Sequence, residues 1–255
     1  MDSSEPKKEV RLQKLIADAG ICSRRAAEAL VAEGAVKVNG KTAEIGQKAD
    51  PGKDRVLVSG KPLPPPPARS LTLAMNKPRG YLCSNSDPHH HKTVFQLLPP
   101  EFDKIRLFCA GRLDKESEGL LILTTDGDLT HRLLHPSRQI SKRYRVRLQH
   151  PFLRKDLPRL LKGVRDEGEL LRADKVYLLG PEKTPETSDQ LEVHLHHGRK
   201  REIRRLFECV GCRVRRLKRI QIGGYVLKGL APGKARVLGP ADVKALLEDP
   251  VQGRR

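Results

Sequence analysis

The first sixty residues show two apolar stripes at helical spacing. The first stripe predicts a helix that Gly20 can end, and it consists of Leu12, Leu15, Ile16 and Ala19. Ser23 is a suitable N-cap for a second helix. The inner face of that helix would carry Ala27, Leu30 and Val31.

Alternating apolar residues replace the helical pattern after Gly34. Val36 and Val38 lead into Asn39-Gly40, which is a strong signal for a two-residue hairpin turn, and residues 56–58 form another short apolar run. We therefore predict a small helix–helix–hairpin domain over residues 10–62. Four consecutive prolines follow it, and such a run is extended and semi-rigid, so residues 63–69 are predicted to be a linker.

The remainder of the chain mixes strand and helix patterns. Apolar runs at residues 105–110 and 120–123 have the length of strands, and residues 143–148 alternate between arginine and apolar or aromatic side chains. A helical stripe runs from Lys200 to Val210. This mixture predicts an α+β domain with a largely antiparallel sheet over residues 70–250.

Charge narrows the choice of partner. The chain has 50 Lys+Arg against 31 Asp+Glu, and its hydrophobic content of 37% is enough for a packed core. The segment from Arg199 to Arg219 contains ten basic residues but only two acids, Glu202 and Glu208. Such density favours a nucleic-acid partner over a membrane, because no long basic amphipathic helix with aromatic anchors accompanies it. Five scattered cysteines and the lack of an apolar leader or spanning segment indicate a cytoplasmic protein; we expect it to be a monomer.

One segment concentrates the candidate chemistry. CAGRLDKESEGLLILTTDGD (109–128) reads as a strand, a polar loop and a second strand, with Asp114 in the loop. Three other features accompany it: a turn at residues 76–80, the basic start of a strand at residues 142–144, and GRKREIRRLFECVG (198–211). A loop aspartate alone is more often a turn or capping residue, so Asp114 gains weight only from this combination.

Together these motifs resemble the RsuA/RluB family of ribosomal RNA pseudouridine synthases, in the order GRLD, EGLL and then GR..EIRR.F..VG. The resemblance covers the chain from Arg11 to Leu247. It implies isomerisation of a specific uridine in ribosomal RNA, or in a ribosome assembly precursor, to pseudouridine. SRQISKRYRV (137–146) is closer to the large-subunit enzymes and IGGYVLKGLAPGKARVL (222–238) to the small-subunit enzymes. We favour the large subunit.

The same resemblance assigns roles to individual residues. Asp114 matches the nucleophile, Tyr144 the tyrosine that stacks on the target base, and Arg204 the arginine that pairs with the aspartate. Arg112 matches a position that contacts RNA as the base leaves the stack, and Lys77 a basic residue expected to line the same cleft. These roles fit the chemistry, because a base inside a helix must flip out to react and an aromatic face can hold it.

Further basic residues are predicted to bind RNA. The segment RLQKLIADAGICSRRAAEALVAEGAVKVNGK (11–41) resembles the alpha-L RNA-binding domain of the ribosomal-protein S-four type, whose second helix and following turn meet RNA. The matching basic positions are Arg24, Arg25, Lys37 and Lys41. In the basic helix we expect Arg201, Arg204, Arg205 and Glu208 to share a face, with Arg201 and Arg205 reaching phosphates.

No cofactor or metal is predicted. The isomerisation exchanges a carbon–nitrogen bond for a carbon–carbon bond with no net redox change, and no phosphate-binding glycine loop is present. Cys209 and Cys212 have C-x-x-C spacing but no second ligand pair near them in sequence. Two alternatives remain at this point: a small-subunit ribosomal RNA pseudouridine synthase, and a non-catalytic RNA-binding or ribosome-assembly protein.

Overall fold

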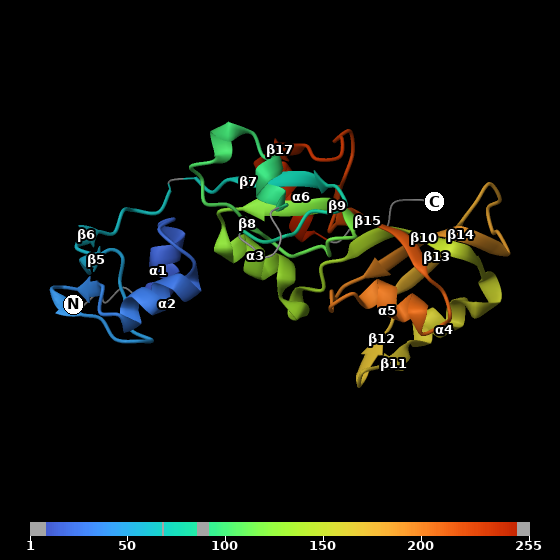
Figure 1. The fold of residues 1–255 in the computed structure, drawn as a ribbon, viewed down its shortest axis with the longest axis horizontal. Coiled ribbons are helices and arrows are strands. Elements are labelled where there is room, and N and C mark those ends of the chain that lie inside the picture. Colours follow the sequence, from blue (N-terminus) through green and yellow to red (C-terminus); the bar gives the residue numbers. More distant parts are fainter. Residues whose placement is uncertain (1–8, 68, 86–91, 249–255) are drawn as a thin grey trace, which may run out of the picture. The chain divides into compact units, whose positions relative to one another are not determined.

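A computed structural model describes residues 9–67, 69–85 and 92–248 of the chain (Figure 1). The chain folds into two compact units, residues 1–70 and 71–255. In the described residues no helix is long and apolar enough to cross a membrane. The predicted mixture of helices and sheets is found, and each unit is described below by itself.

The N-terminal unit packs two helices against short strands. The helices are α1 (Leu12–Asp18) and α2 (Arg24–Ala32). The strands are β1 (Val10–Arg11), β2 (Val36–Val38), β3 (Lys41–Thr42), β4 (Lys48–Ala49), β5 (Val56–Val58) and β6 (Lys61–Pro62). Ser23 caps α2 by accepting the N–H of Ala26 at 3.1 Å, as its position predicts.

A turn at Asn39-Gly40 joins β2 to β3, and both residues have positive φ angles, of 51° and 84°. Strands β3-β2-β5-β6 form one sheet and β1 pairs with β4. The apolar stripes of both helices meet the valines of β2 and β5 in one core.

The C-terminal unit is built on a nine-stranded sheet. Seven of its strands follow the order β13-β14-β10-β15-β9-β7-β17, and the other two are β16, which pairs with β15, and β8, which pairs with β9. Its strands are β7 (Thr72–Lys77), β8 (Phe108–Cys109), β9 (Glu118–Thr124), β10 (Lys142–Leu153), β13 (Lys175–Leu179), β14 (Thr187–Leu195), β15 (Val214–Ile222), β16 (Tyr225–Val226) and β17 (Ala235–Val237). The β15–β9 pair is parallel, and the other pairs described in this sheet are antiparallel. Only part of the apolar run 105–110 forms a strand, the two residues of β8.

Helices cover the sheet on different faces. The described helices are α3 (Gly127–Leu134), α4 (Leu157–Lys162), α5 (Glu202–Glu208) and α6 (Pro240–Leu247), with short 3₁₀ turns at Val94–Leu97, Pro100–Phe102, Pro136–Arg138 and Arg154–Asp156. A separate hairpin joins β11 (Val164–Asp166) to β12 (Glu169–Leu171). In β9, Leu120 and Ile122 face α3 and α6, while Leu121 and Leu123 lie in a second cluster on the opposite face.

Helices α4 and α5 cover one face of β10, β13, β14 and β15. Leu160 of α4 and Ile203, Leu206 and Phe207 of α5 are buried there among the apolar side chains of these strands. Helix α5 is shorter than predicted because Arg201 adopts a left-handed conformation (φ 51°) and the helix begins only at Glu202. This arrangement brings α5 beside the loop between β8 and β9.

Candidate active site

Asp114 lies on the loop that joins β8 to β9, and its side chain is partly exposed. The loop closes on itself, because the Ser117 N–H donates to the Asp114 carbonyl at 3.0 Å. It ends where Gly119 pairs with Arg219 of β15. A Cβ at Gly119 would lie 2.2 Å from the Arg219 carbonyl oxygen, so only glycine permits this close approach of the two strands.

Lys77 holds the Asp114 loop from beneath. Its side chain is fully buried at the end of β7, and Nζ donates to the carbonyls of Ser117 (2.7 Å), Pro78 (3.0 Å), Asp114 (3.2 Å) and Lys115 (3.3 Å). Burial lowers the pKa of this ammonium group. Nearby acidic groups, Asp114 among them, act in the opposite direction and raise that pKa. The expectation that Lys77 lines the cleft and touches RNA is therefore wrong for this structure, because the side chain contacts the protein's own backbone.

Arg204 reaches the same loop from α5. Its Nη2 donates to the Glu116 carbonyl at 3.0 Å and its Nη1 to the Val214 carbonyl at 3.1 Å, while Nε is buried without a partner among the described residues. Burial lowers the pKa of the guanidinium, as does Arg201, whereas Asp114 raises it. No ion pair within 4.0 Å joins Arg204 to Asp114 in the described chain, so the expected direct pairing is absent here. Arg204 instead hydrogen-bonds to the backbone of the loop that carries Asp114.

Tyr144 lies in a core cluster that also contains the residues preceding Asp114 and Arg204 in the sequence. It is 7% exposed and packs in the cluster of Leu113, Ile203 and Leu206. Leu113 precedes Asp114 and Ile203 precedes Arg204 in the sequence. The structure thus brings together the chain segments of all three predicted catalytic residues, which are far apart in the sequence.

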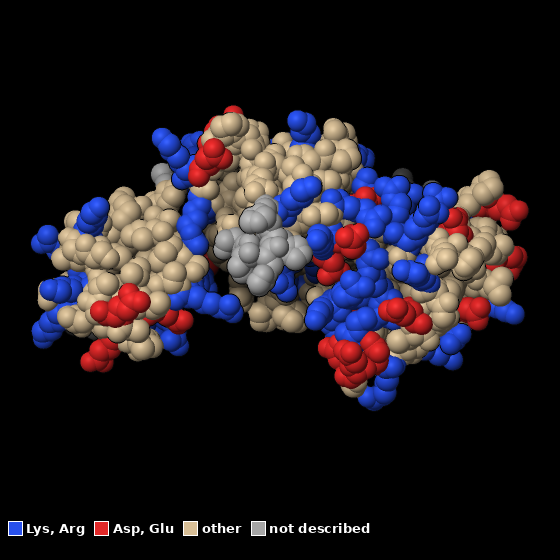
Figure 2. All heavy atoms as spheres, in the orientation of Figure 1, with Lys and Arg blue, Asp and Glu red and all other residues tan. Residues whose placement is uncertain are grey.

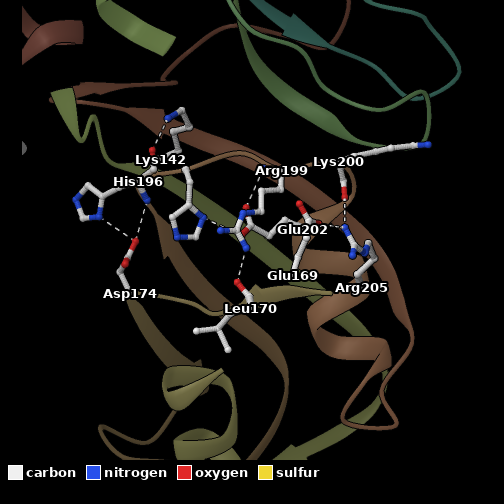
Figure 3. Close-up of polar contacts among 10 residues, drawn as sticks. Lys142, Glu169, Leu170, Asp174, His196, Arg199, Lys200, Glu202 and Arg205 are labelled. Carbon is white, nitrogen blue, oxygen red and sulfur yellow. Dashed lines mark hydrogen bonds and ion pairs between the residues drawn. The ribbon is translucent and has the colours of Figure 1, made fainter. Parts of the chain in front are cut away.

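The other residues of this unit that were predicted to bind RNA differ in whether their side chains are free to do so. Arg112 and Arg201 are exposed. Arg205 is not free: its guanidinium binds Asp166 at 2.5 Å and Glu169 at 2.7 Å on the β11–β12 hairpin. It also donates to the Lys200 carbonyl (Figure 3). The predicted phosphate contact of Arg205 therefore has to compete with two carboxylates. The shared helix face is also wrong, because Arg201 precedes the helix and Arg204 and Arg205 contact different elements.

The predicted RNA contacts of the N-terminal unit are all exposed. Arg24 and Arg25 begin α2, Lys37 lies on β2 and Lys41 on β3. Val36 and Val38, which flank Lys37, are buried in the core, so Lys37 points outward from the sheet.

The structure adds residues that the sequence reasoning did not select. Lys142 at the start of β10 is buried and donates to the His196 carbonyl at 3.0 Å (Figure 3). It also donates to the Ile140 carbonyl at 3.1 Å. Its pKa falls to about 8 because of burial and the nearby Arg219. Arg219 is 4% exposed, and its Nε donates to the Leu120 carbonyl at 2.8 Å. Both residues lie in segments rich in basic residues, and the sequence gives no sign that these two side chains are buried while their neighbours are exposed.

Cys83 is a second unforeseen neighbour of the loop. Its sulfur accepts the N–H of Leu113 at 3.4 Å. A hydrogen bond from Cys109 lowers the pKa of the Cys83 thiol below its ordinary value. Cys209 and Cys212, the residues with metal-like spacing, are free thiols, and no cluster of three or more potential ligands occurs among the described residues.

Lys and Arg side chains gather around α5 and β15 on the face that Figure 2 shows, with acidic residues interspersed. A partly exposed carboxylate on a loop held by the buried Lys77 and the half-buried Arg204, beside a cationic surface, is an arrangement suited to chemistry on RNA.

Comparison with known proteins identifies the family of this chain. The sequence model of RNA pseudouridylate synthase matches residues 72–209, and that of the S4 domain matches residues 10–61. The chain is 39% identical over 244 residues to an uncharacterized RNA pseudouridine synthase of Aquifex aeolicus, covering 94% of each chain. It is 39% identical over 241 residues to the ribosomal large subunit pseudouridine synthase B of Bacillus subtilis, covering 92% of this chain and 95% of that one.

A crystal structure of a pseudouridylate synthase superposes with a TM-score of 0.66 at 28% identity, over 93% of this chain and 99% of the other. The chain therefore belongs to the RNA pseudouridylate synthase family. It is a pseudouridine synthase that carries an N-terminal S4 domain.

Proposed function

We propose that this enzyme converts a specific uridine of large-subunit ribosomal RNA to pseudouridine, with Asp114 as the nucleophile. The observation that carries this proposal is the setting of Asp114: a partly exposed carboxylate whose loop is fixed by Lys77 and Arg204. The substrate follows from the relatives, which include ribosomal large subunit pseudouridine synthase B of Bacillus subtilis. Acting on ribosomal RNA or an assembly precursor, the enzyme would work in the cytoplasm as a monomer.

The chemistry needs few groups. The bond between the ribose C1′ and the uracil N1 breaks, the base turns, and C1′ bonds to C5, which gives up its proton while N1 gains one. No electrons are exchanged with another molecule, so no redox cofactor is required. Asp114 can attack the sugar or the base, or remove a proton from the ribose, and each route uses its ionised form.

The other residues position the substrate in this proposal. Tyr144 supports the flipped uracil by stacking, which contributes on the order of 1–3 kcal/mol per base. Arg112, exposed two residues before Asp114, contacts RNA as the base leaves the helix. Arg204 keeps a cation beside Asp114, and its unpartnered Nε is a donor held close to the site.

The domain roles are part of the same proposal. Residues 10–62 act as an S4-type RNA-binding module with a helix–helix–hairpin fold, residues 63–69 link it to the enzyme, and residues 70–250 form the catalytic domain. Ala68, residues 86–91 and residues 249–250 lie outside the described part of the chain. Arg24, Arg25, Lys37 and Lys41 would contact phosphates, because all four are exposed on one small unit.

Mapping pseudouridine in ribosomal RNA from cells with and without the gene tests the substrate. We expect one large-subunit position, or a few adjacent ones, to lose the modification, and purified enzyme to restore it on protein-free large-subunit RNA. Loss at a small-subunit position would replace the large-subunit assignment, and unchanged maps of both RNAs would overturn ribosomal RNA as the substrate.

A further inference from the structure

The part of the sheet formed by β13, β14, β10 and β15 has a second face that α4 and α5 do not cover. Tyr144, Val146 and Leu148 of β10 point into the core, so the alternating Arg143, Arg145 and Arg147 point the other way. Residues opposite one another on paired strands share a face. The registers therefore define an outer sheet face, which consists of Arg143, Arg145, Arg147, Lys175, Tyr177, Leu179, Gln190, Glu192, His194, Arg216, Lys218 and Gln221. His194 and Gln221, at one end of this face, are buried.

This outer sheet face has an excess of positive charge. Carboxylates pair with three of its six cations, at 3.6 Å for Arg145 with Glu192, 3.0 Å for Arg147 with Asp189 and 2.8 Å for Arg216 with Glu118. These arginine side chains remain 51–56% exposed, so their pairs are weak and can give way to another anion.

Two lysines of this face contribute positive charge that no carboxylate of the described chain offsets in an ion pair. Lys175 is exposed and Lys218 is half-buried, and neither has an ion pair within 4.0 Å among the described residues. Residues two apart on a strand are about 6.6 Å apart and neighbouring strands about 4.8 Å apart. The cations consequently form an array that suits a chain of phosphates better than a single small anion.

An aromatic ring lies within the array. Tyr177 is 49% exposed, and its ring meets that of His194 edge-on with centroids 5.5 Å apart. Cations together with an exposed aromatic ring are the combination by which proteins bind single-stranded nucleic acid, since every base offers a face for stacking. An acidic protein segment would use the charges but would gain less from the ring.

We propose that the outer sheet face binds a second segment of the substrate RNA, on the side of the sheet opposite Tyr144. This rests on the proposed function, because ribosomal RNA is long enough for one segment to occupy the cleft while another reaches around the sheet. The surface would add affinity and orientation without touching the reacting uridine.

The test compares two double variants of the full chain. Lys175→Ala with Lys218→Ala removes two cations from the outer sheet face and leaves no carboxylate without its partner. Lys155→Ala with Lys162→Ala is the control; it removes two exposed lysines from the layer of α4, which covers the other face. Affinity for protein-free large-subunit ribosomal RNA is measured across a salt series, together with the single-turnover rate at saturating RNA and the melting temperature.

We expect the first pair to reduce the salt slope by about two, one per lost phosphate contact, and the control to leave it unchanged. Tyr177→Phe should retain affinity and Tyr177→Ala should lose several-fold, and ultraviolet cross-linking should join RNA to the peptide that contains Tyr177. Equal slopes in the parent and the first pair, with both folded, would overturn the proposal and leave an acidic protein segment as the occupant. Failure of the proposed function would look different, since the parent itself would make no pseudouridine in this RNA.

Discussion

The basic residues of two regions of this enzyme differ in their partners: some bond to the protein's own backbone and others are exposed to solvent. Around the Asp114 loop, Lys77 and Arg204 give their hydrogen bonds to the protein's own carbonyls. On the N-terminal unit, Arg24 and Arg25 are exposed on the first turn of α2. We therefore expect cations that bond to the protein's own backbone to shape the site, and exposed cations to recruit the substrate. Changes in the first region should therefore affect turnover, and changes in the second should affect binding.

Lys77→Met should have the largest effect after loss of the nucleophile. It leaves up to four carbonyls without their donor, and a buried group that loses a charged partner costs about 3 kcal/mol or more. We expect a lower free energy of unfolding and a single-turnover rate at saturating RNA reduced on the order of 10²-fold, because the Asp114 loop is misplaced.

Lys115→Met is the matched control, since Lys115 is exposed on the same loop. It should retain both the stability and the saturated rate. If Lys77→Met behaved like Lys115→Met in both measurements, the positioning role of Lys77 would be wrong.

Arg204→Ala and Arg201→Ala should have different effects, although the two residues are only three positions apart in the sequence. Arg204 holds the Glu116 carbonyl and the charge near Asp114, so its loss should lower the saturated single-turnover rate at least tenfold with little change in affinity. Exposed Arg201 should behave as a phosphate contact, and its loss should lower the salt slope by about one. Equal losses of affinity with the parent's rate in both variants would make Arg204 another phosphate contact.

Arg24→Ala combined with Arg25→Ala should have a smaller and different effect. Both side chains are exposed, so we expect weaker RNA binding, a salt slope lower by up to about two and an unchanged rate at saturation. The measurement is affinity in a salt series with single-turnover kinetics on the same RNA. A loss of saturated rate with unchanged affinity would contradict the recruiting role of the N-terminal unit.

The prediction for Lys142 concerns stability against pH, and it has the smallest expected effect on turnover and RNA binding. Burial lowers its pKa from 10.5 to about 8, so between these values the unfolded chain binds the proton that the folded protein releases. The free energy of unfolding should therefore rise with pH through this window, by at most about 3 kcal/mol from this group. Chemical denaturation from pH 7 to 10.5 should show a shallower rise for Lys142→Met than for the parent, and identical slopes would exclude this assignment.

The sequence predicted elements where the pattern was local. The alternation in residues 143–148 and the Asn39-Gly40 turn are both seen, because strand alternation and a two-residue hairpin depend on near neighbours. Apolar residues 105–110 looked like one strand but pair only at β8, because a short apolar run does not specify what it pairs with.

The roles of the basic residues depended on partners that are distant in sequence. Arg205 is engaged by Asp166 and Glu169, 39 and 36 residues away, on a hairpin that the apolar pattern did not reveal. Lys77 is buried because the loop around Asp114 folds over it, 37 residues further along. Charge type was visible in the sequence, but burial was decided by long-range packing.

The central claim is that Asp114 performs the chemistry while the surrounding cations position its loop and the RNA. The most direct test is the single-turnover formation of pseudouridine by Asp114→Asn at saturating large-subunit ribosomal RNA, with affinity and melting temperature measured on the same preparation. We predict no detectable pseudouridine together with the parent's affinity and fold. Turnover comparable to that of the parent would contradict the account.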